Sequence, residues 1–305
     1  MTPQSVILPQ PSEHAWFIVV NLGQATTTQL IIQLNSLLDR KLLLIKQNSD
    51  ADIKTAIGFG ANLWSQLHPT TPKELQILEP INGLVNMPAS PADLIIHIAS
   101  KRSDLCFDLA QTFFDGIKNL LDVKEDLTCF RYMDKRDLTG FIDGTENPYV
   151  QQERADVTLI PEGEFKDGSF IFAQRYIHDL DKWHKLDTTS QEHVFGRSKT
   201  DSVEMTPETK PHNAHIARTV IENSEGEELH IVRHSLPYGT GNGDKGIFFI
   251  AYTKELERIN TMLSRMYGTS GDGIQDHLLS FTTPQDGAYY FCPSEELLNT
   301  VINTD

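Results

Sequence analysis

The feature that most constrains the fold is a strand-and-helix pattern that occurs twice, about 150 residues apart. In the first half, the apolar run from Leu94 to Ala99 precedes a helical stripe of apolar residues from Leu105 to Ile117. In the second half, the run from Ile247 to Tyr252 precedes a similar stripe from Leu256 to Tyr267, with Thr253 as the predicted N-cap. A pattern that repeats in this way predicts two related halves.

Each half is predicted to be ferredoxin-like, an α+β arrangement in which helices cover one face of an antiparallel sheet. An aromatic and β-branched run from Ala15 to Leu22 opens the first half, and a helical stripe starts at Leu30. The prolines between His68 and Pro91 exclude long regular elements in that segment. We therefore expect an N-terminal domain over residues 1–150 and a C-terminal domain over residues 151–305.

Charge and cysteine usage narrow the class of protein. Lys and Arg number 26 against 42 Asp and Glu, and the net charge of -16 opposes binding to nucleic acid or to an anionic membrane. Cys106, Cys129 and Cys292 include no C-x-x-C pair, which argues against a disulfide framework, a zinc ribbon and a covalently attached c-type haem. The N-terminus has neither a basic start nor a long apolar run, so we expect a cytoplasmic protein.

The segment from Gly140 to Pro148 is the first candidate for a functional site. It reads Gly-Phe-Ile-Asp-Gly-Thr-Glu-Asn-Pro, so that two apolar residues precede Asp143 and a glycine follows it. This order favours a carboxylate held against a pocket. The same residue types are typical of turns, and a plain polar turn is the alternative.

Four of the eleven histidines lie between residues 212 and 234. His212 and His215 are three apart and His230 and His234 are four apart, a spacing at which two imidazoles on one helical face bind zinc. No H-E-x-x-H motif or matching cysteine set accompanies them. A single axial imidazole on a haem iron, accompanied by an acid and an arginine, is the second hypothesis.

The segment from Leu229 to Pro237 supplies an arginine of this kind. Its mixture of apolar and polar residues predicts a strand. Because side chains alternate between the two faces of a strand, Arg233 and Ser235 are expected on the same face.

Taken together, these segments resemble the dye-decolourising peroxidases, and specifically their compact bacterial cytoplasmic branch. The resemblance spans most of the chain. The matching segments are Gly140 to Pro148, Gly196 to Lys199, His215, Arg233 to Ser235, Gly246 to Tyr252 and Asp276 to Leu279. The resemblance implies two ferredoxin-like domains, with haem b (iron protoporphyrin IX) held in the C-terminal one.

The resemblance also implies a role for individual residues. His215 would be the proximal iron ligand, and Asp276 would accept the other ring N–H of that histidine. Asp143 would be the distal acid and Arg233 the distal arginine, with Ser235 at a position of less certain role. The remaining implied haem contacts are Arg197 to a propionate, Phe249 or its neighbour Phe248 on the distal side, and Ile142, Gly144 and Thr145 around the acid.

The implied function is a haem peroxidase that reduces hydrogen peroxide and oxidises bulky phenolic or dye-like reductants by one-electron steps through a ferryl intermediate. Asp143 would transfer the peroxide proton, and Arg233 would stabilise the developing negative charge. A carboxylate in place of a distal histidine stays ionised to lower pH, which predicts an acidic optimum. Relatives imply a homo-oligomer, a dimer or larger. The alternatives are a non-catalytic haem-binding or haem-delivery protein and an enzyme that removes iron or a carboxylate from a porphyrin.

Overall fold

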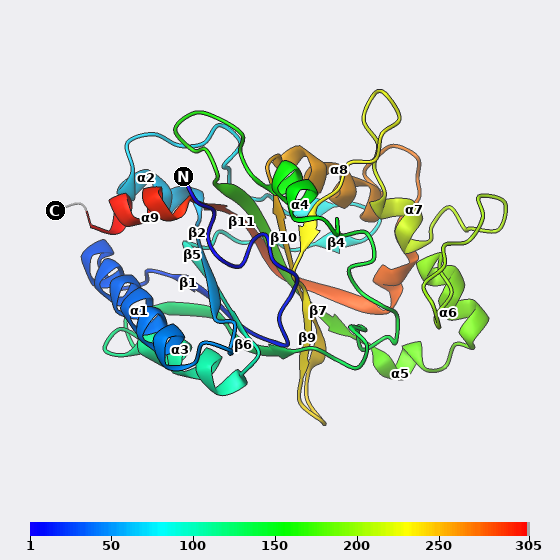
Figure 1. The fold of residues 1–305 in the computed structure, drawn as a ribbon. Helices are drawn as coiled ribbons and strands as arrows, with labels where there is room; N and C mark the ends of the chain where they lie inside the picture. The colour runs from blue at the N-terminus through cyan, green and yellow to red at the C-terminus, as the bar shows by residue number, and fades with distance from the viewer. Residues whose placement is uncertain (304–305) are drawn as a thin grey trace.

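One antiparallel sheet with two groups of four strands organises the chain (Figure 1). The computed structural model describes residues 1–303. Across the sheet, the first group is β6 (Asp122–Phe130), β1 (His14–Asn21), β5 (Leu94–Ser100) and β2 (Lys54–Phe59). The second group is β11 (Thr282–Cys292), β7 (Ser169–His178), β10 (Lys245–Thr253) and β8 (Val232–Arg233), and β9 (Leu236–Gly239) also pairs with β10. The two groups meet where Phe291 of β11 pairs with Phe59 of β2.

Both groups have the same topology. In each, the strands lie in the order fourth, first, third, second along the chain, which is the order of a ferredoxin-like sheet. The first half contributes the helices α1 (Thr27–Gln47) and α3 (Ser103–Phe114), and α8 (Leu256–Met266) follows β10 in the second half as α3 follows β5 in the first. The predicted α+β fold with two ferredoxin-like halves is therefore confirmed.

The remaining elements are short. The proline-rich segment carries only a two-residue pairing of β3 with β4, as its composition predicts. The short elements, including these two strands, are α2 (Ala61–Leu67), β3 (Ile81–Asn82), β4 (Asn86–Met87), α4 (Gln151–Thr158), α5 (Leu180–Trp183), α6 (Thr188–Phe195), α7 (His215–Thr219), the 3₁₀ helix η1 (His277–Ser280) and α9 (Glu295–Ile302).

Local sequence signals explain the main helices. Thr26 and Gln29 form a reciprocal capping box at the start of α1, which satisfies backbone N–H groups that a helix leaves unpaired. The predicted N-cap of α8 was wrong, because the cap is Glu255. The hydroxyl of Thr253 instead bonds to the backbone of Glu255. The helix ends before Gly268, whose positive φ of 74° suits glycine.

The sheet separates two apolar cores. On β10, Phe249 and Ala251 face one core with the helices, whereas Phe248, Ile250 and Tyr252 face the other. The second core lies where the halves meet, and Phe248 stacks there on Phe17 of β1, with ring centroids 4.3 Å apart. This alternation along one strand decides which side chains can reach the cavity described below.

The last helix returns to the first half. In Figure 1, α9 (red) lies at the same end of the molecule as α1 and α2. The side chain of Asn35 on α1 donates to the carbonyl of Ile302, and the backbone N–H of Thr2 donates to Glu296. The predicted domain limits of 1–150 and 151–305 stay a prediction. None of the helices within residues 1–303 combines the length and apolar character that a membrane crossing requires.

Candidate active site

A cavity lies between the sheet of the second half and the helices that cover it. Strands β7 and β10, helices α7 and α8 and the segment after residue 136 all contribute to its walls. Most of the lining is apolar, including Phe172, Ile216, Phe249, Met262, Leu263 and Leu279. Of the residues predicted to form the site, the cavity is lined by Ile142, Asp143, Thr145, Arg197, His215, Arg233 and Phe249.

His215 is held by Asp276 in a fixed orientation. It is the first residue of α7, and its Nδ1 lies 2.6 Å from Oδ2 of Asp276. Asp276 is fully buried, and its other carboxylate oxygen accepts the backbone N–H of Leu278 at 2.8 Å. Asp276 therefore caps η1 and binds the imidazole at the same time. With Nδ1 engaged in this way, Nε2 is the ring nitrogen of His215 left for a ligand in the cavity.

The segment Gly140 to Pro148 is a turn, and it also lines the cavity. Phe141 is buried and stacks on Phe195, with ring centroids 4.0 Å apart, which anchors the segment to the neighbouring small core. Gly140 and Gly144 have φ values of 89° and 78°, a region that favours glycine. The backbone N–H of Gly144 donates to Oδ1 of Asp143 at 2.7 Å. The segment is therefore a turn, as one hypothesis predicted, and it also holds the carboxylate of Asp143 at the cavity, as the other predicted.

Asn147 and Arg136 attach this segment to the rest of the site, and neither was among the predicted site residues. The amide of Asn147 donates to the carbonyl of Arg233 and accepts its N–H, both at 2.8 Å. As a result, Arg233 and Asp143 approach each other, with 3.6 Å between Nη1 and Oδ1. Arg136 donates to the carbonyls of Gly140 and Lys199, which joins two of the segments that carry the family resemblance.

Ser235 does not line the cavity, and the strand predicted from Leu229 to Pro237 is interrupted. Strand β8 ends at Arg233 and β9 begins at Leu236, so the expected alternation does not hold for Ser235. The backbone N–H of Ile250 donates to the buried Ser235 hydroxyl at 3.3 Å. The hydroxyl thus replaces a carbonyl as the acceptor for β10 at this irregular point.

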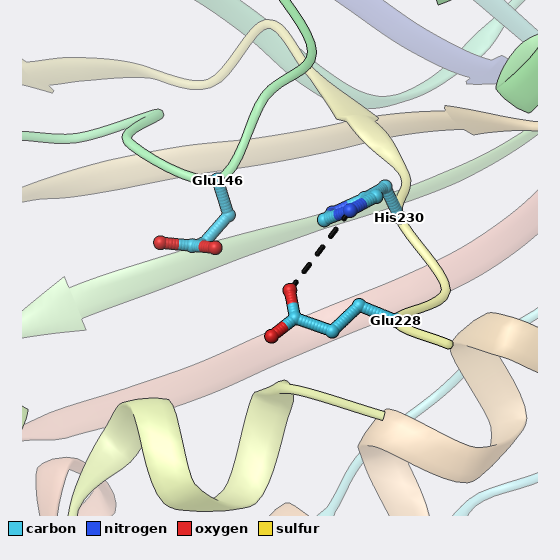
Figure 2. Close-up of side chains that lie close together, drawn as sticks. All are labelled: Glu146, Glu228 and His230. Carbon is cyan, nitrogen blue, oxygen red and sulfur yellow. Dashed lines mark ion pairs between the residues drawn. The ribbon is translucent and has the colours of Figure 1, made fainter. Parts of the chain in front are cut away.

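Arg197 lies at the cavity and is paired with acids. It follows the left-handed Gly196 that ends α6, and its guanidinium bonds to Glu146 and lies 3.3 Å from Glu204. Glu146 also belongs to a group with Glu228 and His230, whose ligand atoms all lie within 4.8 Å of one another. Figure 2 shows these three side chains converging from two segments.

The predicted zinc pair of His230 and His234 is not brought together. His230 lines the cavity, whereas His234 is buried on the other side of the sheet beside Arg154. Burial and the charge of Arg154 lower the pKa of His234 to about 3.

A second histidine–acid pair at the cavity was missed from the sequence. Nε2 of His178 lies 3.0 Å from Asp137, and Nδ1 lies 2.8 Å from the hydroxyl of Thr282. Burial raises the pKa of Asp137, but His178 and hydrogen bonds from Thr139 outweigh this effect and lower it to about 2. His178 is 41 positions from Asp137 and 104 from Thr282 in the sequence, and no local pattern marks their contact.

The fold and the cavity define a class of protein. The fold has two ferredoxin-like halves, and the second carries an apolar cavity lined by a histidine, an acid and an arginine. This is the arrangement of a protein that holds a prosthetic group. The models of the N-terminal and C-terminal parts of Dyp-type peroxidases match residues 4–131 and 134–297, respectively. The chain therefore belongs to the Dyp-type peroxidase family, and it is an enzyme of the oxidoreductase class.

Individual relatives match between 81% and 98% of the chain. The dye-decolorizing peroxidase of Rhodococcus erythropolis is 35% identical over 251 residues, which are 81% of this chain and 74% of that protein. The structure of a dye-decolorizing protein from V. cholerae has a TM-score of 0.91 at 37% identity, covering 97% of this chain and 98% of the other. DypB from Rhodococcus jostii RHA1 has a TM-score of 0.89 at 32% identity, covering 98% of this chain and 97% of the other. Variants of DypB have been solved with heme and with manganese.

Proposed function

We propose that the cavity holds haem b and that the enzyme uses it to reduce hydrogen peroxide at the expense of an organic reductant. The observation that carries this proposal is the His215–Asp276 pair. A metal-binding histidine usually donates its second ring N–H to a carboxylate, which fixes the tautomer and raises the basicity of the ligand nitrogen. The bond of 2.6 Å to a fully buried carboxylate has this form, and Nε2 is available at the cavity.

The lining fits a porphyrin. A porphyrin needs an apolar slot for its ring and cationic groups for its propionates, and the cavity combines aromatic and aliphatic walls with Arg197. Arg197 already pairs with Glu146 and Glu204, so a propionate would share or displace these partners. Ile142, Thr145 and Phe249 would contact the ring, and Gly144 would allow the turn beside Asp143. Bound haem would supply the redox chemistry, accepting two electrons from the reductant in single steps and passing them to peroxide.

Asp143 and Arg233 are placed to handle the proton and the charge. Peroxide must lose a proton from one oxygen and gain one at the other before its O–O bond breaks. Asp143 can accept and return that proton directly or through one water, since its side chain is partly exposed at the cavity. The guanidinium of Arg233 is a cation with N–H donors and no acceptor, so it would stabilise negative charge on the peroxide without competing for the proton. Asn147 would keep the two side chains together through the backbone of Arg233.

The reductant would be a phenolic or dye-like molecule that gives up single electrons. Manganese is a second candidate, because a variant of one relative has been solved with it and Glu146, Glu228 and His230 offer oxygen and nitrogen ligands at the cavity. In that case Mn²⁺ would lose one electron and become Mn³⁺. We also propose a cytoplasmic homo-oligomer, in line with the absence of a C-x-x-C pair and the resemblance to the family.

Manganese binding is tested by titrating Mn²⁺ and following the loss of its free-ion signal in electron paramagnetic resonance. Glu228→Gln is expected to weaken binding at least tenfold, whereas the exposed Glu225→Gln is the matched control and leaves it unchanged. Equal binding by both variants would leave the organic reductant as the better hypothesis.

The main proposal is tested by absorption spectra of the haem-supplied protein before and after one equivalent of hydrogen peroxide. We expect a Soret band that changes promptly with peroxide and is lost in His215→Ala. The exposed His212→Ala is the matched control and should keep both properties. A Soret band that does not change with peroxide would favour a haem carrier. The absence of any Soret band would show that the protein does not bind haem and would contradict the proposal.

A further inference from the structure

Tyr252 and His97 form a hydrogen-bonded pair that joins the two halves. Tyr252 is on β10 of the second half and His97 is on β5 of the first, and 2.9 Å separates the phenol oxygen from Nδ1 of the imidazole. Tyr252 is fully buried and His97 is 2% exposed. The bond therefore lies in the core where the halves meet, away from solvent.

The pair is next to the strand that carries the cavity arginine. In the register of β10 and β8, Tyr252 pairs with Val232 and Ala251 pairs with Arg233. Because side chains alternate along β10, Tyr252 points to the face opposite the cavity. The sheet therefore lies between the phenol and the cavity. A substrate in the cavity cannot reach the phenol directly, whereas an electron can pass through the sheet.

We propose that Tyr252 is a redox-active tyrosine of this enzyme and that His97 is its proton acceptor. This inference rests on the proposed function, since it requires haem that peroxide has oxidised. In the step, one electron passes from the phenol to the oxidised haem, the O–H bond of Tyr252 breaks, and its proton passes to Nδ1 of His97. A neutral tyrosyl radical and an imidazolium result. One electron from the reductant and the return of the proton restore the pair.

An imidazole acceptor distinguishes Tyr252 from Tyr176 and Tyr289, two other buried tyrosines. Oxidation makes a phenol strongly acidic, so a tyrosine is oxidised readily only where a base can take its proton. Tyr176 lines the cavity, but its hydroxyl bonds to another phenol, that of Tyr267, at 3.1 Å. The hydroxyl of Tyr289 donates to the amide oxygen of Asn260 at 2.7 Å. Neither a phenol nor an amide oxygen is a useful base.

His97 is ready to accept a proton in the resting enzyme. Burial, followed by the nearby His234 and Lys54, holds the pKa of His97 well below its usual range, so the ring is neutral. In the tautomer with its proton on Nε2, the lone pair of Nδ1 faces the phenol. The same surroundings disfavour the imidazolium, so the proton returns as soon as the radical is reduced. The pair would hold one oxidising equivalent only while no reductant is present.

The test is electron paramagnetic resonance of the haem-loaded full chain, frozen after mixing with one equivalent of hydrogen peroxide without reductant. We expect an organic radical whose hyperfine pattern narrows when ring-deuterated tyrosine is incorporated. Tyr252→Phe should lower this signal at least tenfold, whereas Tyr289→Phe, the matched buried control, should keep it. His97→Gln keeps a polar partner but removes the base, and it should also lower the signal although Tyr252 remains.

The absorption change of the same samples separates this inference from the proposed function. If the haem reacts with peroxide but Tyr252→Phe retains the radical, or Tyr176→Phe alone removes it, the assignment to Tyr252 is wrong. A wild-type sample that reacts but forms no tyrosyl signal also overturns it. If no absorption change occurs, the proposed function itself fails. Should Tyr252→Phe not take up haem, His97→Gln decides the result, with an unchanged radical contradicting the proposal.

Discussion

Two acids of the proposed site, Asp276 beside His215 and Asp143 beside Arg233, are held in contrasting ways. Asp276 is fully buried, lies 2.6 Å from His215 and has its second oxygen fixed by the N–H of Leu278. The side chain of Asp143 is 24% exposed and lies 3.6 Å from Arg233. A buried acid with both oxygens bonded keeps one geometry, whereas a partly exposed acid with a loose partner leaves room for a small molecule.

This contrast suggests that Asp276 and Asp143 have different roles in the same site. A group that holds an iron ligand must not move or exchange its proton with solvent, and Asp276 meets both conditions. A group that moves a proton must reach the reacting molecule and change its partners, which Asp143 can do. The predictions below test whether this difference in geometry is also a difference in role.

The largest effect is expected from the loosely held pair. Asp143→Ala and Arg233→Ala should each lower the second-order rate constant for peroxide by about 10²- to 10⁴-fold, because each removes a proton-transfer or charge-stabilising group. Stopped-flow measurement of the haem absorbance gives this rate constant. The exposed Asp134→Ala, in a neighbouring turn, is the control and should react normally. Unchanged rates with full haem loading in both variants would remove the catalytic assignment.

A smaller effect is expected at the tightly held pair. Asp276→Asn keeps the shape and an acceptor for the Leu278 N–H, but it removes the negative charge beside His215. We expect the haem to bind, its reduction potential to rise, and the peroxide rate constant to fall by about 10- to 100-fold. The measurements are a redox titration and the same stopped-flow assay. A normal potential combined with a slow reaction would mean that Asp276 acts on the cavity in some other way than through the ligand.

Asp137, which was missed from the sequence, allows a buried acid to be tested by its effect on the free energy of unfolding. Asp137 is buried and bonded like Asp276, and its pKa of about 2 lies below its ordinary value of 3.8. An acid with a lowered folded-state pKa adds stability above its unfolded pKa and loses it as the pH falls through the folded value. Asp137→Asn should therefore cost about 2 kcal/mol near pH 6, with the difference from wild type shrinking between about pH 4 and pH 2.

Urea unfolding at several pH values measures this effect. The exposed Asp134→Asn is the control, and it should unfold like the wild type at every pH. A constant difference between Asp137→Asn and wild type across the acid range would show that the lost interaction does not depend on the charge of Asp137.

The sequence predicted the parts of this molecule that depend on local pattern. Strands such as β5 and β10 and the stripe of α8 follow from short runs, and the repeated pattern led to the two halves. Phe249 could not be separated from Phe248, because only the observed register shows which neighbour faces the cavity. Asp137 and His178 were missed because their contact is made by tertiary packing alone. The role of Asn147 depends on a backbone pairing with Arg233 that no spacing reveals.

The smallest effect is expected at Ser235, where the family resemblance and the geometry give different expectations. Its hydroxyl lies outside the cavity lining and accepts the N–H of Ile250. Ser235→Ala leaves this buried N–H without a partner, so it should cost about 1 to 2 kcal/mol of stability. The rate constant for peroxide should change less than threefold, because Asn147 still holds the backbone of Arg233. Urea unfolding and the stopped-flow assay measure the two quantities, and Asp143→Ala supplies the scale for a catalytic loss. If Ser235→Ala were as slow as Asp143→Ala, the hydroxyl would have to reach the cavity in the working enzyme, and the site would be less rigid around Arg233 than its backbone bonds indicate.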